Sequence, residues 1–374
     1  INKVMAGYGK RTRQDDPMIH FYEDFLKAYD QSLRKNCGVY YTPQPVVNYI
    51  VRAVDEILQT EFGLADGLAD TSMTPKGQHK VQILDPATGT GTFLAEVIHA
   101  IHDKMKGQQG MWQSYVEKHL LPRLNGFELL MASYAMAHLK LDMVLAETGY
   151  EANSTQRLRV YLTNSLEEYQ PDTGTLFANT LSNEANEANH IKRDAPVMVV
   201  VGNPPYSGES NNKGDAFKWI TSLMDDYKRE PDTDKPLNER NPKWINDDYC
   251  KFIRLGQAFV DKNTEGVLAY INNHSFLDNP TFRGMRWSLM QSFDRIYIID
   301  LHGNSKKKEA CPDGSKDENV FDIQQGVSIN IFIKKGKKRK GKLAEVYHCD
   351  LYGKRKVKYD YLSEHTFSTT DFTR

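Results

Sequence analysis

Short apolar runs alternate with amphipathic stretches along the chain from about residue 80 onward. Five of these runs predict strands, at 81–84, 124–128, 158–162, 197–201 and 266–271. The run at 197–201 is entirely apolar, which is typical of a central strand buried on both faces of a parallel sheet. Apolar residues at helical spacing begin near Thr92 and again near Leu130. The alternation of strands and helices predicts a doubly wound α/β fold.

The segments on either side of this alternating region have different patterns. Residues 17–36 and 46–58 carry apolar side chains at helical spacing, and residues 63–79 are expected to form a loop. Apolar runs at 296–299 and 327–333 have no long helix between them and predict a closing antiparallel hairpin. Three polar stretches are expected to be loops, at 179–194, 207–215 and 229–247.

The composition is that of a folded globular protein. The chain has 374 residues, of which 40% are hydrophobic and 26% charged, and its length predicts about two domains or one large domain with additions. With no long apolar run and a polar beginning, neither a membrane helix nor a signal peptide is expected. Four widely separated cysteines favour a reducing, cytoplasmic location. The first residue is not Met, which indicates a fragment of a longer protein.

The charged residues and the possible metal ligands do not by themselves indicate a function. His99 and His102 lie one helical turn apart, but no third ligand follows at matching spacing, so we interpret the pair as a helix face and expect no metal site. The formal net charge is −1. Basic clusters at 306–308 and 334–342 are candidates for contacts with phosphates, and a solvated turn between two strands explains the second cluster equally well.

A turn that contains two glycines follows the first predicted strand and opens a helix. Gly89 and Gly91 allow the backbone to pass close to a ligand, and the helix start offers free N–H groups. The turn lacks the third glycine of a dinucleotide site and the lysine of a P-loop. Asp85, at the strand end, suits a ligand that carries a cationic amine. An ordinary tight connection between strand and helix is the alternative.

Two further polar residues follow the next two strands. Glu128 ends the second strand, where an acid can accept hydrogen bonds from the two ribose hydroxyls of a nucleoside; a surface glutamate is the alternative. Asn164 follows the third strand, where its side chain can contact an adenine edge or cap a helix.

The sequence Asn203-Pro204-Pro205-Tyr206 directly follows the apolar fourth strand. The two prolines make a rigid turn that lacks local N–H donors. The side-chain oxygen of Asn203 and the carbonyl of Pro204 can therefore both accept from one exocyclic amine, and Tyr206 offers a flat face for a ring. A purely structural turn is the alternative reading.

These motifs, in this order, resemble the gamma-class amino-methyltransferases that make N6-methyladenine in DNA. The motifs that carry the resemblance are Tyr41-Thr42-Pro43, the turn from Asp85 to Gly91, Glu128 and Asn203 to Tyr206. The segments 21–26, 38–43 and 350–355 are similar to the methyltransferase region of single-polypeptide Type I (Type ISP) restriction–modification enzymes. The resemblance spans roughly residues 18–362.

The resemblance implies a Rossmann-like S-adenosylmethionine-dependent methyltransferase sheet and a role for each matching residue. Asn203, Pro204, Pro205 and Tyr206 correspond to the catalytic motif, and Tyr206 and Phe321 to aromatic residues that stack on the target base. A hydrophobic anchor for its loop is the alternative for Phe321. The residues that correspond to the cofactor site are Tyr41, Thr42, Pro43, Asp85, Ala87, Thr88, Gly89, Gly91, Thr92, Phe93, Glu128, Asn164 and Phe252.

The resemblance also implies the domain organisation and the partners. Residues 1–37 correspond to a helical coupling segment, 38–349 to the methyltransferase domain, and 350–374 to a connector toward a target-recognition domain outside this chain. The expected partners are double-stranded DNA and a covalently linked nuclease and helicase-like ATPase, in a prokaryotic cytoplasm. Methylation of a protein glutamine amide or an RNA amine, and a non-catalytic scaffold that binds the cofactor and DNA, are the alternatives.

Overall fold

A computed structural model of the chain describes residues 41–152, 156–168, 179–206, 208, 210, 212–233, 235–239, 242–336 and 341–374. The predicted helix at 17–36 and the whole of the proposed coupling segment 1–37 therefore lie outside the described residues. Among the described residues, no helix is both long enough and apolar enough to cross a membrane.

One mixed sheet organises the described part of the chain, with the strand order β3-β2-β1-β4-β5-β7-β6-β8. Strands β1 to β5 run parallel, β7 is antiparallel to both β5 and β6, and β8 is parallel to β6. The strands are β1 Gln82–Asp85, β2 Leu124–Glu128, β3 Arg159–Leu162, β4 Val197–Gly202, β5 Glu265–Asn273, β6 Arg295–Asp300, β7 Val327–Lys335 and β8 Glu345–Asp350.

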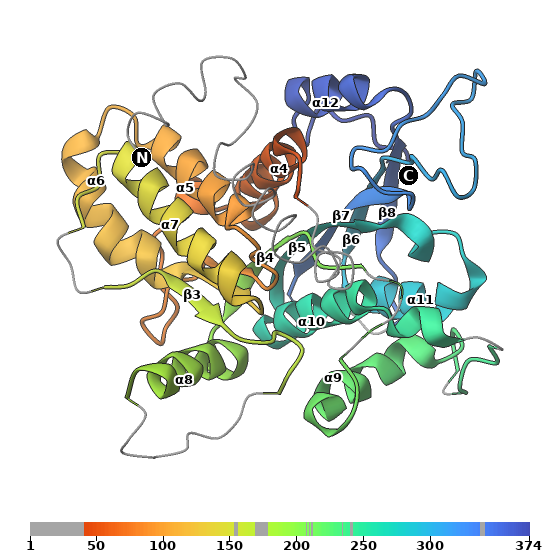
Figure 1. Ribbon diagram of the computed structural model, residues 1–374, viewed down its shortest axis with the longest axis horizontal. Helices are drawn as coiled ribbons and strands as arrows, with labels where there is room; N and C mark the ends of the chain where they lie inside the picture. Colours follow the sequence, from red (N-terminus) through yellow and green to blue (C-terminus); the bar gives the residue numbers. More distant parts are fainter. Residues whose placement is uncertain are drawn as a thin grey trace.

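Helices cover both faces of the sheet (Figure 1). Helices α4, α5, α7 and α12 lie on one face, and α8, α10 and α11 lie on the other. The larger helices are α4 Gln44–Phe62, α5 Thr92–Lys104, α7 Met131–Glu147, α8 Asn179–Asp194, α10 Asp248–Asn263, α11 Arg283–Ser292 and α12 Arg355–Glu364. The shorter helices α6 Gln109–Tyr115 and α9 Lys218–Leu223 complete the set. The doubly wound α/β prediction is confirmed.

Burial explains why β4 is central. All six of its residues are buried, so both faces of this strand pack against covering helices. Strand β4 pairs in parallel with β1 on one side and β5 on the other. The strand order reverses between β1 and β4, and an open parallel sheet binds ligands at such a switch point, outside the carboxyl ends of its strands.

The structure corrects two expectations from the pattern. Residues 179–194, predicted to be a loop, form helix α8. Its many asparagines are weak helix formers, but Ala188 and Ile191 lie one turn apart and are buried, so packing outweighs propensity. Strand β8 was not predicted, because it is a half-exposed edge strand with polar residues along it. The predicted antiparallel pairing of the two apolar runs at the end is confirmed in β6 and β7.

The C-terminal residues pack onto the sheet and the helix that covers it. Helix α12 contacts α4, and Thr373 pairs with His348 of β8. Lys358 of α12 forms an ion pair with Asp317 at 2.8 Å, and both side chains are inaccessible to solvent. The Lys358 ammonium also donates to the carbonyl oxygens of Leu301 (2.6 Å) and Glu318 (2.7 Å). That residues 350–374 continue toward a recognition domain stays a prediction.

We expect Lys358→Met to lower the free energy of unfolding by about 3–5 kcal/mol, because it leaves the Asp317 carboxylate buried without its cation. Chemical denaturation would measure the change. Lys356→Met on the same helix is the matched control, since its ion pair with Asp360 is exposed, and we expect little effect from it. Equal losses in the two variants would contradict this prediction.

Candidate functional site

The polar residues predicted from the sequence converge at one edge of the sheet. Asp85 and Glu128 are the last residues of β1 and β2. Asn164 lies two residues beyond β3, and Asn203 directly follows β4. Because these four strands are parallel neighbours, their carboxyl ends lie side by side at the switch point. The structure therefore brings together residues that are more than 100 positions apart in the chain.

Backbone conformation and one hydrogen bond shape the turn after β1. Gly89 and Gly91 adopt φ values of 56° and 83°, which lie in the left-handed region that favours glycine. The backbone N–H of Gly89 donates to Oε2 of Glu128 at 2.8 Å. This bond ties the turn that opens α5 to the end of the neighbouring strand.

Asp85 is a buried acid that suits a cationic ligand. Its Oδ1 accepts from the backbone N–H of Ala87 at 3.0 Å. Its Oδ2 is buried and, among the residues that the structure describes, has no hydrogen-bond partner. Burial raises the pKa of Asp85 from 3.8 to about 8, and the nearby Glu128 adds to this. A cationic amine at Oδ2 would stabilise the ionised form, which is the type of ligand that the sequence predicts for this acid.

Glu128 is held by backbone donors from two directions. Besides Gly89, the N–H of Leu130 donates to its Oε1 at 2.8 Å. Burial raises the pKa of Glu128 to about 7, against the effect of these bonds. The neighbouring side chains of Leu129 and Met131 are 56% and 61% exposed, which is high for large apolar residues. This apolar surface was not predicted from the sequence, where its signal is the run of three apolar residues that directly follows the acid.

A hydrogen bond joins the Asn-Pro-Pro-Tyr segment to the start of α4. Nδ2 of Asn203 donates to Oγ1 of Thr42 at 3.0 Å, and Thr42 is 6% exposed. Pro43 then caps α4 at its N-terminus, and Tyr41 is half-buried. The Tyr-Thr-Pro segment and the catalytic motif predicted from the sequence are thus in direct contact, 161 positions apart.

The segment after Tyr206 is anchored to helix α10. The ammonium of Lys251 donates to Oγ of Ser210 (2.6 Å) and to the carbonyl of Asn212 (2.7 Å). The Asn212 side chain donates to Asp248 at 3.0 Å and accepts from Nδ2 of Asn164 at 2.9 Å. These bonds hold the loop after β4 against the ends of β3 and α10.

Three of the predicted contacts are occupied by the protein itself. Oδ1 of Asn164 accepts from the N–H of Leu166 at 3.0 Å, the local capping arrangement, so its contact with adenine stays a prediction. Tyr206 and Phe321 are each 4% exposed. Burial of Phe321 agrees with its role as a hydrophobic anchor, and stacking on a base stays a prediction for both aromatic residues. Phe252 is also buried, on α10.

The basic stretch at 334–342 is partly used within the fold. Lys334 pairs with Asp261, and Lys335 pairs with Glu61 at 2.9 Å. Residues 337–340 lie outside the described part of the chain. A DNA contact from this stretch stays a prediction.

Side chains that could hold a metal ion lie elsewhere in the fold. Among the described residues, two groups of histidines and carboxylates have their ligand atoms within 4.8 Å of one another, and both include His302. His99 and His102 belong to neither group, and the ring of His102 packs edge-on against Trp112 at 4.9 Å.

Comparison with known proteins identifies the family. The family model described as N-6 DNA Methylase matches residues 13–232, which is more than half of the chain. The chain belongs to the N-6 DNA methylase family. This membership implies S-adenosylmethionine as the cofactor, in agreement with the buried acid and the glycine turn at the switch point.

The curated relative Type II methyltransferase M.BstVI of Geobacillus stearothermophilus is 24% identical over 230 residues. The match covers 62% of this chain and 35% of the relative, so the chain spans about a third of that protein.

Solved structures with the same fold cover nearly the whole chain. The Type ISP restriction–modification enzyme LlaBIII bound to DNA is 24% identical, with a TM-score of 0.76, over 94% of this chain and 23% of that one. A nuclease-deletion mutant of the Type ISP enzyme LlaGI, in complex with a DNA substrate mimic, is 24% identical, with a TM-score of 0.73. That match covers 94% of this chain and 27% of the LlaGI chain. The chain in the DrdV–DNA complex is 25% identical, with a TM-score of 0.73, and the match covers 95% of this chain and 32% of that one.

We expect Asp85→Asn to flatten the pH dependence of stability of the ligand-free protein between about pH 4 and about pH 8. The pKa of Asp85 is raised from 3.8 to about 8, so the folded state holds a proton that the unfolded chain has released. The stability of the wild type therefore falls as the pH rises, until Asp85 ionises in the folded state. Thermal unfolding across this range measures the slope.

Glu151→Gln is the matched control for this prediction, because Glu151 is an exposed acid. Glu128, whose pKa is raised to about 7, keeps its own smaller contribution in the Asp85→Asn variant. An unchanged slope in Asp85→Asn would show that Asp85 does not carry the buried proton.

Proposed function

We propose that this chain transfers the methyl group of S-adenosylmethionine to the N6 amine of adenine in double-stranded DNA. Family membership supports an adenine-specific DNA methyltransferase. The observation that carries the proposal is the hydrogen bond from Asn203 to Thr42. It holds the amine-binding motif at the same sheet edge as the buried Asp85, so acceptor and methyl donor meet there.

The residues of the chain have distinct tasks in this proposal. Asp85 holds the cationic amine of the cofactor, Glu128 its ribose hydroxyls, and Thr42 lies beside its methionine end. The cofactor supplies an electrophilic methyl group when it is bound. Leu129 and Met131 give an apolar surface next to the ribose site, suited to one face of a purine ring.

The acceptor amine is a weak nucleophile, because its lone pair is delocalised into the adenine ring. Oδ1 of Asn203 and the carbonyl oxygen of Pro204 accept the two N–H groups and favour a more tetrahedral nitrogen. The lone pair of that nitrogen is then aimed at the methyl carbon, so positioning does most of the work. The amine in a duplex is reached by flipping the base out of the stack, and Tyr206 and Phe321 replace its lost stacking.

We assign the chain to the modification part of a Type ISP restriction–modification enzyme. The likeness of its fold to LlaBIII and LlaGI over 94% of the chain supports this assignment, as does the small share of those proteins that it covers. A nuclease, a helicase-like ATPase and a target-recognition domain in the same polypeptide are the proposed partners. The proposed divisions are 1–37, 38–349 and 350–374, and the proposed location is a prokaryotic cytoplasm.

Transfer of labelled methyl from S-adenosylmethionine to mixed-sequence duplex DNA tests the proposal. We expect label in N6-methyladenine, and we expect Asn203→Ala to lower kcat by about a hundredfold or more, because the acceptor amine loses one of its two positioning contacts. Cofactor binding, measured separately, should be retained in this variant, since Asp85 and Glu128 are unchanged.

Asn238→Ala is the matched control, an exposed asparagine that we expect to leave the rate unchanged. The full-length natural polypeptide should be assayed beside the chain, because the DNA target is read by the proposed recognition domain. Label on protein or RNA, with none on DNA, would refute the proposed substrate. If the full-length polypeptide also binds the cofactor without transferring methyl to any acceptor, the chain is a non-catalytic scaffold and the proposal is wrong.

A further inference from the structure

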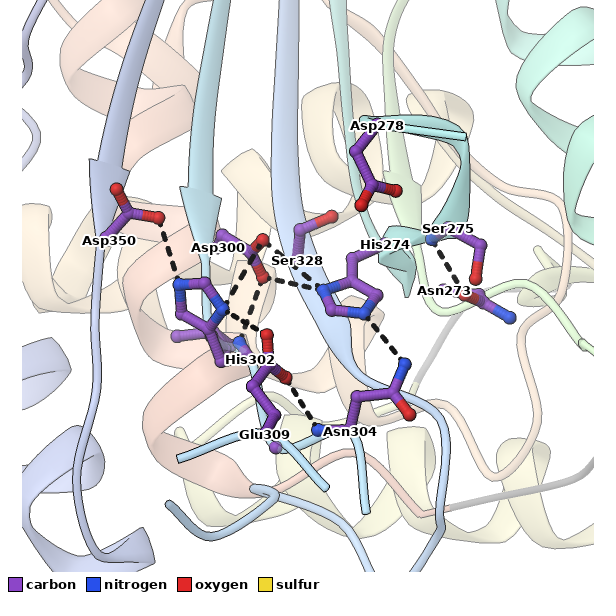
Figure 2. A network of polar contacts seen from close by, with 12 residues as sticks. Asn273, His274, Ser275, Asp278, Asp300, His302, Asn304, Glu309, Ser328 and Asp350 are labelled. Atoms are coloured by element: carbon purple, nitrogen blue, oxygen red, sulfur yellow. Dashed lines mark hydrogen bonds and ion pairs between the residues drawn. The ribbon is translucent and has the colours of Figure 1, made fainter. Parts of the chain in front are cut away.

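Five titratable side chains converge at the far side of the sheet from β1 (Figure 2). His274 directly follows β5, Asp300 ends β6, His302 lies two residues beyond it, Glu309 lies in the segment between β6 and β7, and Asp350 ends β8. Strand β7 lies between β5 and β6, and β8 is parallel to β6 with Asp350 opposite Asp300. The sheet topology therefore assembles this cluster from segments up to 76 positions apart.

Three of the four ring nitrogens of the two histidines face carboxylates. Nδ1 of His302 lies 2.9 Å from Oε1 of Glu309, and its Nε2 lies 2.9 Å from Oδ1 of Asp350. Nδ1 of His274 lies 3.0 Å from Oδ1 of Asp300. Carboxylates are acceptors, so both nitrogens of His302 require either a proton or another cation.

The charge of the cluster also calls for a cation. Within the described part of the chain, every ion pair of Asp300, Glu309 and Asp350 is with a histidine, and none is with a lysine or arginine. Three carboxylates are thus gathered around two nearly buried imidazoles, each 6% exposed.

The backbone of His302 adds a further observation. Its φ of 51° lies in the left-handed region, which costs a residue other than glycine free energy. That conformation is held by the backbone N–H of His302, which donates to Oδ1 of Asp300 at 2.9 Å. The fold therefore maintains the position of this ring against a local cost.

We propose that His274, His302 and Glu309 bind a divalent transition metal ion of the zinc type. One ligand atom from each of these residues lies within 4.8 Å of the others, so the three side chains would move closer together to bind one ion. Two imidazoles and one carboxylate suit zinc better than magnesium or calcium, which prefer oxygen ligands. Asp350 holds the far nitrogen of His302, the arrangement in which a carboxylate orients a metal-bound histidine.

Metal binding and protonation compete at this site. The ion displaces the proton shared by His302 and Glu309, and His274 gives up its bond to Asp300 or the one from Nδ2 of Asn304, which lies 3.2 Å from its Nε2. The second ligand group, Asp300, His302 and Asp350, shares His302 and includes an exposed aspartate, so we assign the ion to the more buried group. The ion joins β5 and the segment 301–326 and acts structurally, independently of methyl transfer.

Titration of the untagged, chelator-treated protein with Zn²⁺ tests the proposal. We expect one tightly bound ion per chain, and a melting temperature that rises when zinc is added, because the ion binds only the folded cluster. Glu309→Gln replaces the ligating carboxylate with an amide of nearly the same shape. We expect it to weaken zinc binding at least tenfold and to abolish the zinc-dependent rise in melting temperature.

His348→Gln is the matched control, because His348 is an exposed histidine that contacts Asp350 at 3.1 Å but belongs to neither ligand group. It should bind zinc as the wild type does. Absence of stoichiometric binding, or binding that Glu309→Gln leaves unchanged, would overturn the proposal. The cluster would then be a network of hydrogen bonds between histidines and carboxylates without a metal ion. Replacement of zinc by Co²⁺ gives a second readout, since visible absorption of tetrahedral cobalt should appear in the wild type and not in Glu309→Gln.

Discussion

The convergence of parallel strand ends at one edge of the sheet is the constraint on which the proposed methyltransferase site depends. A strand that ends at this edge leaves its last residues without further sheet partners, so polar side chains there can face a ligand. Asp85, Glu128 and Asn203 occupy three such ends. The hydrogen bond from Asn203 to Thr42 then adds the segment before α4 to the same edge. The helices pack on both faces of the sheet and hold these strands in place.

Burial of acids at this edge has an electrostatic cost that a ligand can relieve. Removal from water raises the pKa of Asp85 to about 8 and that of Glu128 to about 7, so neither carboxylate is fully ionised at neutral pH without help. Two backbone N–H groups donate to Glu128 and partly stabilise its ionised form, whereas Oδ2 of Asp85 has no such donor within the residues described. A preference for a cationic ligand is therefore built into the end of β1.

The C-terminal part of the sheet combines a reversed strand with an added edge strand. Insertion of β7 between β5 and β6 brings the ends of β5 and β6 to either side of the start of β7. Addition of β8 places Asp350 beside Asp300, and α12 then holds the segment between β6 and β7 through Lys358. Two clusters of charged side chains thus include residues of this long connection, and each is assembled only in the complete fold.

The sequence by itself determined the alternation of strands and helices, the turn after β1 and the motif after β4, because each depends on neighbours within a few residues. It also placed Asp85 and Glu128 at the ends of predicted strands and Asn203 directly after one, and the carboxyl ends of neighbouring parallel strands lie at the same edge of a sheet. It misjudged α8, where the burial of Ala188 and Ile191 outweighs a poor helical composition.

Only the tertiary structure decided which distant side chains meet. Local patterns do not show that Asn203 contacts Thr42, that Phe321 is buried, or that α12 packs on α4. The same holds for the cluster around His302, whose members are unremarkable singly and spaced without a motif. Such contacts depend on strand order, and strand order follows from how the whole chain buries its apolar surface.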